Sequence, residues 1–414
     1  MLDEDMDSFE FGIVLSKTSE GERLKQQMDG WIEEARASGE LDSIATKWTD
    51  GPEEEKTMPN YQSFPAPNGT LVMATEPAYA PMEYYRDGEV VGMDVDLAAR
   101  FCEDNGYGLE IMVLNFDGIL PAVQSGKANF AISGITITDE RKESMNFTES
   151  YYTGGTVMAV RISDKGSSGS GAEPSSFWEG ITESFSKTFL REDRWKLFVE
   201  GVAVTLLITL VAIFLGTALG FAVYVLCRNG GSVPNAISGF CMWLLQGMPM
   251  VVLLMILYYV VFGGLSIDGI VVSIIGFTLT FGTSVFGMLK MGVGAVDDGQ
   301  REAAFALGYS DGETFFKIIL PQALPHVMPA FKSEIVSLIK ATSIVGYIAV
   351  RDLTKMGDVV RSRTYEAFFP LIAVTIIYFL LEGLVGILSG KLENSVNPKR
   401  RGADRILKGV KTDD

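Results

Sequence analysis

Residues 299–308 read GQREAAFALG, and residues 318–321 read IILP. This polar segment lies between two apolar stretches, so it predicts a loop with two short helices on one face of a membrane. Ala303 and Ala304 would let another protein surface approach closely. Gly308 can end the first helix because it lacks the Cβ that makes left-handed backbone costly.

The remaining residues of this loop fit the ends of the two short helices. Glu302 suits the positive N-terminal end of the first helix, and Pro321 is expected to end the second. The loop resembles the EAA coupling loop of ATP-binding-cassette importer permeases, in which a short helix docks on a separate ATPase subunit. The resemblance implies that the ATPase contact is formed by Glu302, Ala303, Ala304, Gly308, Leu320 and Pro321.

Charge is distributed unevenly along the 414 residues. Residues 1–170 hold 31 of the 52 acidic and 13 of the 34 basic side chains, so the net charge of −18 lies entirely there. This argues against nucleic acid as a partner, because phosphate binding needs clustered Lys and Arg. Cys102, Cys227, Cys241 and His326 lack metal-ligand spacing, and the sequence contains no phosphate-binding loop. We expect no metal or cofactor on this chain, and ATP only on a partner ATPase.

Five apolar stretches in the C-terminal half are long enough to cross a bilayer as helices. They are Gly201–Leu226, Pro234–Ile267, Gly269–Leu289, Pro329–Val350 and Ala367–Gly390. Basic residues after the fifth stretch and Arg228 after the first predict a cytoplasmic C-terminus and an extracytoplasmic N-terminal half in a multi-pass membrane protein. Basic residues within 187–196 oppose this orientation, so residues 179–197 are expected to form an amphipathic helix in the membrane interface.

Two further segments of the membrane half carry small, proline and polar residues. They read QGMP at 246–249 and LIKATS at 338–343. Residues 198–392 resemble the permeases of polar amino-acid uptake systems, which implies a second permease half, as homodimer or heterodimer, and two ATPases. Ser333–Glu334 departs from that family's usual pair. Candidate residues of the translocation path are Gln246, Glu334, Lys340, Thr342 and Glu382.

Charged groups inside a bilayer are costly unless they are paired or wetted. Glu334, Lys340 and Glu382 are therefore expected to face the interior of the helix bundle if they lie at depth. A static interior pair of Lys340 with Glu382 is an equally good interpretation.

The segment from Thr70 to Val160 alternates short apolar runs with helix-like segments, which predicts an α/β lobe. Strands are expected at Leu71–Ala74, Leu109–Leu114 and Phe130–Ser133, and helices beginning at Val95 and Ile119. A ligand of such a lobe binds at the carboxyl ends of its strands. The predicted fold class is thus an α/β lobe followed by an all-α membrane domain of five helices.

Four segments of this lobe share a pattern. They read ATEPAYAP at 74–81, VGMDVDL at 91–97, FDG at 116–118 and GITITDER at 134–141. They resemble the first lobe of extracellular solute-binding proteins of family 3, with the type II periplasmic-binding fold. The resemblance implies that Arg141 binds the α-carboxylate of an amino acid, which suits its two-pronged donor. The other implied contacts are Glu76, Tyr79, Phe116, Gly134 and Thr136.

Structural roles compete with these assignments. Arg141 could form a surface ion pair with Asp139 or Glu140, and Tyr79 and Phe116 could be ordinary packing residues. Residues 11–50 resemble the C-terminal end of the same family, and residues 1–50 are expected to pack on 69–160 in permuted order. The second lobe, which normally holds the α-amino group, is absent, so binding by this chain is expected to be weak. The acidic start without an apolar signal segment suggests a fragment of a longer protein.

The expected domains follow from these patterns. They are the end of a solute-binding domain (1–50), a first lobe (69–163), a Gly/Ser-rich linker (164–178), an interfacial helix (179–197), a permease domain (198–392) and a basic cytoplasmic tail (393–414). The favoured function is the permease of an ATP-driven importer of polar amino acids, with a tethered binding lobe. An amino-acid-sensing receptor that does not transport is the alternative. A ligand-gated channel is disfavoured because the sequence has no filter segment such as TVGYG.

Overall fold

The computed structural model describes residues 8–86, 88–155, 177–228, 230–265, 267–364 and 368–396. They form two compact units. The first contains Met1–Gly201, Met255–Gly269 and Val345–Ile372, and the second contains Val202–Leu254, Ile270–Ile344 and Ala373–Asp414. Most of the predicted linker 164–178 and of the predicted tail 393–414 lies outside the described residues.

The first unit is built around a five-stranded sheet in the order β7-β3-β8-β2-β9. Its strands are β2 (Val14–Leu15), β3 (Thr70–Thr75), β7 (Gly108–Val113), β8 (Phe130–Ala131) and β9 (Asn146–Phe147). β3 pairs in parallel with β7 and β8, and β2 is antiparallel to β8 and β9. The three strands predicted after residue 70 are confirmed, and the N-terminal segment completes the same sheet.

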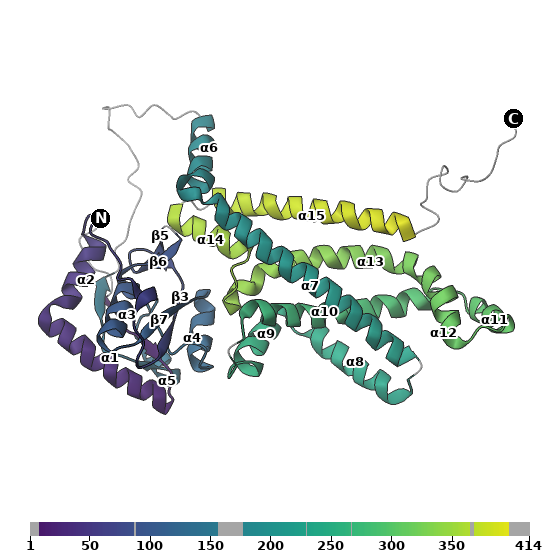
Figure 1. The fold of residues 1–414 in the computed structure, drawn as a ribbon, viewed down its shortest axis with the longest axis horizontal. Coiled ribbons are helices and arrows are strands. Elements are labelled where there is room, and N and C mark those ends of the chain that lie inside the picture. The colour runs from purple at the N-terminus through teal and green to yellow at the C-terminus, as the bar shows by residue number, and fades with distance from the viewer. Residues whose placement is uncertain are drawn as a thin grey trace. The chain divides into compact units, whose positions relative to one another are not determined.

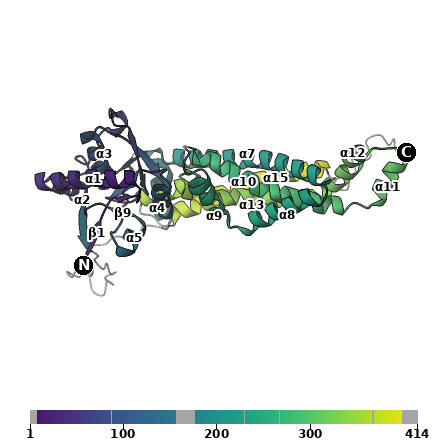
Figure 2. The ribbon, with the colours of Figure 1, turned by 90° about the horizontal axis from the view of Figure 1, so that it is seen from below.

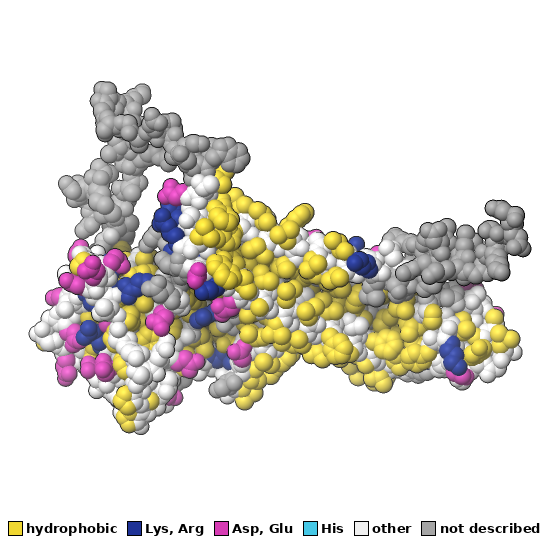
Figure 3. Space-filling view, turned by 45° about the horizontal axis from the view of Figure 1, so that its top comes forward, with side chains coloured by type: hydrophobic (Ala, Val, Ile, Leu, Met, Phe, Trp, Pro, Cys, Tyr) yellow, Lys and Arg dark blue, Asp and Glu magenta, His cyan; other side chains and the backbone are white. Residues whose placement is uncertain are grey.

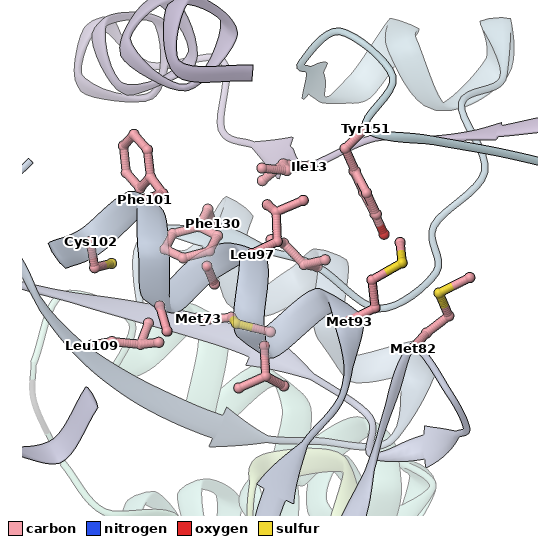
Figure 4. Close-up of a cluster of buried hydrophobic side chains, with 14 of the residues drawn as sticks. Ile13, Met73, Met82, Met93, Leu97, Phe101, Cys102, Leu109, Phe130 and Tyr151 are labelled. Carbon is pink, nitrogen blue, oxygen red and sulfur yellow. The ribbon is translucent and has the colours of Figure 1, made fainter. Parts of the chain in front are cut away.

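Helices cover both sides of this sheet (Figure 1). They are α1 (Ser19–Ser38), α2 (Glu40–Thr49), α3 (Met93–Asp104) and α4 (Phe116–Gln124). α1 buries Leu24, Met28, Trp31 and Ile32, a helical spacing that places one apolar face on the core. In Figure 4, Ile13 of the N-terminal segment lies beside Leu97 in the cluster that includes Met73 and Phe130. The expected packing of residues 1–50 on 69–160 is confirmed for the described residues, 8–50 on 69–155.

Smaller elements surround the sheet of this α/β lobe, by which we mean residues 8–155. β1 (Ser8–Phe11) pairs antiparallel with β10 (Tyr152–Gly155). A three-stranded sheet contains β4 (Ala78–Tyr79), β5 (Glu83–Arg86) and β6 (Glu89–Val91). A 3₁₀ turn lies at Tyr61–Ser63 and helix α5 at Asp139–Ser144.

The helix predicted at 179–197 is interrupted. α6 (Phe177–Phe185) is followed by a π turn (Ser186–Leu190) and a 3₁₀ turn (Arg191–Asp193), and a new helix begins at Trp195. The break is held by Arg194, which is buried and donates from Nη1 to the Lys187 carbonyl oxygen at 2.8 Å. The prediction of one helix over 179–197 was therefore wrong. The Arg194 guanidinium binds a backbone carbonyl of the preceding turn where the helix is broken.

The second unit is made of long and short helices, with α11 and α12 at one end of the bundle (Figure 2). They are α7 (Trp195–Arg228), α8 (Ser232–Gly247), α9 (Met250–Met255), α10 (Gly269–Gly294), α11 (Gly299–Ala306), α12 (Asp311–Glu313), α13 (Leu320–Ala341) and α15 (Phe369–Val396), some of which extend into the first unit. Among the described residues three helices, α7, α10 and α15, are long and apolar enough to cross a membrane, or up to five if each of two bent helix pairs is one span.

The second predicted span is not one straight helix. α8 ends at Gly247, and the chain bends by 107° before continuing as α9 and a π segment (Ile256–Val261). Met248 is extended, with φ −92° and ψ 136°, as expected for a residue before proline. Pro249 thus accounts for a break that hydropathy alone did not predict.

The fourth predicted span also has different bounds. α13 begins at Leu320, before the expected start at Pro329, and a 3₁₀ segment (Thr342–Ile348) follows it. The expectation that Pro321 ends a helix was wrong, because it lies in the first turn of α13. The helical run continues through Pro321, because a π segment (Thr314–Ile319) leads directly into α13.

Candidate functional site

The carboxyl ends of β3 and β7 bring two of the predicted ligand residues together. The Glu76 backbone N–H donates to Ser133 Oγ at 3.1 Å. Its carboxylate Oε2 accepts the backbone N–H of Phe116, the first residue of α4, at 3.2 Å. A carboxylate at a helix N-terminus is stabilised by the backbone dipoles there. The Phe116 ring is 41% exposed.

The other predicted contacts form a second group on the same lobe. The Tyr79 ring lies against Gly134, since a Cβ built on that glycine would be 2.9 Å from two ring carbons, and it meets Phe11 edge-on at 6.4 Å between centroids. Arg141 Nη1 donates to the Thr136 carbonyl oxygen at 2.9 Å. Gly134 has φ +52°, which favours glycine independently of the nearby ring. Tyr79 is 48% exposed, so one face of this group is open to a ligand.

Two buried acidic side chains, Glu83 and Asp94, form hydrogen bonds with residues beside both groups. Asp94 accepts the Gly134 N–H at 2.8 Å and the Tyr151 hydroxyl at 2.9 Å, while Glu83 accepts the Ser133 hydroxyl at 2.8 Å. Burial, followed by the Asp94 charge, raises the pKa of Glu83 well above its ordinary value, and burial raises the pKa of Asp94. The pair therefore retains a proton where an exposed glutamate has lost it.

Sequence reasoning missed one charged contact of the site. Lys355, on α14 (Leu353–Thr364) of the first unit, forms an ion pair with Glu76 at 3.2 Å between Nζ and Oε1. It lies in a short segment between two apolar stretches, where a single lysine carries no pattern that would mark it. Its contact with the lobe arises only in the folded chain.

The coupling loop belongs to the second unit and exposes apolar side chains. α11 spans Gly299–Ala306, and Gly308 has φ +86°, so the predicted end of the first helix is confirmed. Glu302 and Ala303 are exposed, and Phe305 and Leu307 are 45% and 79% exposed. These two side chains leave apolar surface of the loop open to solvent.

The candidate path residues lie in the second unit in different surroundings. Glu334 accepts a hydrogen bond from Ser284 at 2.7 Å, and Lys340 pairs with Glu382 at 3.0 Å between Nζ and Oε2. Thr342 is buried, and its hydroxyl donates to the Ile339 carbonyl oxygen at 2.7 Å. Gln246 is exposed near the end of α8. Lys340 and Glu382 form the expected pair, but the Lys340 side chain is 60% exposed, so the pair is not interior within this chain. The role of these residues in a path stays a prediction.

Comparison with known proteins places both parts of the chain. The family model of bacterial extracellular solute-binding proteins, family 3, matches residues 71–351. The C-terminal region is similar to the permease protein GlnP of Rickettsia typhi, named for a glutamine transport system, with 30% identity over 48% of this chain and 92% of the relative. The arginine transport system permease protein ArtQ of Bacillus subtilis is 31% identical over 48% of this chain and 91% of its own length.

A solved structure described as an amino acid ABC transporter with histidines is 27% identical, with a TM-score of 0.45, and covers 48% of this chain and 94% of that chain. From the family model and the two permeases, the chain belongs to the bacterial extracellular solute-binding proteins of family 3 and, through its C-terminal region, to the permeases of amino-acid ABC transporters.

Proposed function

We propose that the chain is the permease of an ATP-driven importer of polar amino acids, with a tethered extracytoplasmic lobe that binds the substrate. A separate ATPase docks on the loop from Glu302 to Pro321, and ATP binding and hydrolysis on that subunit drive alternating access. The exposed apolar surface of this loop, with Leu307 79% exposed, is the observation that carries the proposal.

The proposed topology has five spans, formed by α7, the bent pair α8–α9, α10, α13 and α15. It is supported by the segments that each compact unit contains. Met255–Gly269 and Val345–Ile372, which include the links after spans two and four, belong to the same unit as the lobe, whereas residues 299–321 belong to the other. Because these links would be extracytoplasmic in this topology, the grouping agrees with a cytoplasmic coupling loop.

A second permease half is part of the proposal. α8 buries none of its residues within this chain, and Trp243 and Val233 are 70% and 68% exposed. Such an apolar surface would be covered by lipid or by a neighbouring permease. The same chemistry would allow a homodimer or a heterodimer.

Transport into vesicles tests the proposal. The chain and its co-purified ATPase would be reconstituted, and ATP-dependent uptake of labelled L-glutamine and L-arginine measured. We expect Glu302→Lys to abolish uptake and release the ATPase, because it reverses the charge of Glu302 on the coupling loop. Glu54→Lys, the same change on an exposed residue of the lobe, is the control and should transport normally. Normal uptake by Glu302→Lys would contradict the role of the loop.

A further inference from the structure

The ammonium group of Lys355 is buried and fully partnered. Its Nζ donates to Asn115 Oδ1 at 2.6 Å, to the Leu114 carbonyl oxygen at 3.2 Å and to Glu76 Oε1 at 3.2 Å. The residue is 5% exposed. An ammonium has three N–H donors, so these three acceptors satisfy it completely.

Hydrogen bonds at the start of α14 hold this lysine in place. Asp352 is fully buried, and its carboxylate accepts the Thr354 N–H at 2.9 Å and the Lys355 N–H at 3.1 Å. Met356 and Val359, on the next turn, belong to the same buried cluster as the core of the lobe. α14 is therefore packed as part of the first unit, and Lys355 has little freedom to move alone.

A second contact within this unit fixes the end of β7. The Asn115 N–H donates to the Gly346 carbonyl oxygen at 3.3 Å. The Tyr259 hydroxyl lies 2.7 Å from the Tyr347 carbonyl oxygen and 3.1 Å from that of Gly118, so both can accept its proton. A Cβ at Gly118 would lie 2.8 Å from the Tyr347 oxygen, which explains why this close approach needs glycine.

The acceptors of Lys355 lie at the carboxyl ends of β3 and β7, where a parallel sheet binds its ligands. Together they provide one carboxylate, one amide oxygen and one backbone carbonyl, a set that suits a primary ammonium. The amino group of a free amino acid is such an ammonium. With Lys355 in place, one Glu76 oxygen is used by the lysine and the other by the Phe116 N–H.

Space for a small molecule borders this ion pair. A cavity of about 240 Å³ is lined by Glu76, Ala78, Tyr85, Lys355 and Arg361, among others. Arg361 lies next to the cavity and pairs with Asp358 at 3.1 Å. A molecule entering this cavity would meet the carboxylate that Lys355 now holds.

We propose that Lys355 is a built-in ligand of the lobe, whose ammonium occupies the site that would otherwise take the amino group of an amino acid. α14 and the free amino acid then compete for Glu76 and Asn115. This inference rests on the proposed function, since it assumes that the lobe binds an amino acid. Because α14 is packed in the same unit, the competitor is always present, and apparent affinity is reduced by the fraction of molecules in which the site is free.

The test measures binding of L-glutamine and L-arginine to the full chain in detergent by titration calorimetry. Lys355→Met keeps the length of the side chain and removes the ammonium, so we expect affinity to rise by about tenfold or more. Lys127→Met is the matched control, because Lys127 also joins segments of this unit, through the Leu265 carbonyl oxygen and the Tyr258 ring, away from Glu76. It should leave affinity within about twofold.

Equal affinities in the native chain and Lys355→Met would overturn the inference and leave the proposed function intact. If the vesicles take up the amino acid but neither the native chain nor Lys355→Met binds it, the inference is also overturned and the proposed function stands. Loss of both uptake and binding in every variant would instead remove the proposed function, and the inference with it.

A second measurement avoids any folding defect of Lys355→Met. Acetylation of Lys355 by an amine-reactive ester, followed by mass spectrometry, should be slow in the native chain and at least about fivefold faster in Glu76→Gln. Unchanged protection in Glu76→Gln would show that the carboxylate does not hold the lysine, which contradicts the inference.

Discussion

The α/β lobe buries its large apolar side chains, whereas the helices of the second unit expose many of theirs. In the lobe, Trp48, Phe101 and Phe130 are at most 1% exposed, whereas Phe214 and Phe379 on the long helices are 74% and 73% exposed. Figure 3 shows hydrophobic side chains spread over the surface of the long helices and charged ones gathered on the lobe. The lobe folds by removing apolar surface from water, and the helices present it to a lipid solvent.

The largest expected difference follows from truncating one aromatic residue in each region. Trp48 is fully buried, donates to Asp96 at 2.8 Å and meets Tyr84 edge-on. Trp48→Ala should destabilise the lobe by about 3–5 kcal/mol, because it leaves a cavity and removes one hydrogen bond from the buried Asp96 carboxylate. Phe214→Ala should leave the lobe unchanged. Resistance to a short protease pulse at increasing urea, in detergent, measures both. Equal shifts in the urea midpoint would contradict the comparison.

A smaller effect is expected from the buried charge of the lobe. Asp96 is fully buried and binds Lys47 at 2.7 Å and Arg100 at 3.0 Å. Asp96→Asn should cost about 2 kcal/mol, since Lys47 loses its carboxylate partner in a protected site and Arg100 keeps only Glu40. Asp358→Asn removes an exposed ion pair with Arg361 and should cost less than about 0.5 kcal/mol. The same urea midpoints distinguish them, and similar costs would show that Asp96 is better solvated than its burial indicates.

Local patterns predicted the lobe better than the loops that join it to other segments. Apolar patterns indicated the strands β3, β7 and β8 and the helices α3 and α4, because each of these elements buries one face against a single core. The break at Met248–Pro249 was missed because hydropathy averages over the residue before proline, which must be extended. Pro321 was misassigned because a proline can begin a helix as readily as end one.

The candidate site was predictable only where its residues belong to one segment. Glu76, Tyr79 and Arg141 could be named because they lie in recognisable patterns near strand ends. Lys355 could not, since its contact with Glu76 spans 279 residues and depends on how α14 packs. Nor does the sequence reveal that the pKa values of Glu83 and Asp94 are raised, because that depends on their burial in the fold.

The acid pair gives the lobe a pH dependence that the long helices should lack. Burial raises the pKa of Glu83 in the folded state, so the native chain binds more protons than the unfolded chain above pH about 4.5. Stability of the lobe should therefore fall as pH rises from about 4.5 toward the raised pKa. Glu83→Gln should flatten this slope, because the amide does not titrate. The check is the urea midpoint of both chains across pH 4 to 8, and an unchanged slope in Glu83→Gln would refute the assignment.

The smallest effect concerns helix caps, where the two regions should behave alike because both caps lie in water. Thr18 Oγ1 accepts the Gly21 N–H at 3.2 Å in the lobe, and Ser310 Oγ accepts the Glu313 N–H at 3.3 Å in the coupling loop. Thr18→Ala and Ser310→Ala should each cost about 1 kcal/mol. Amide hydrogen exchange should accelerate about fivefold in the first turn after each cap. A much larger effect of Ser310→Ala would mean that the cap also orders the docking loop, so the two regions would then differ at their polar ends as well.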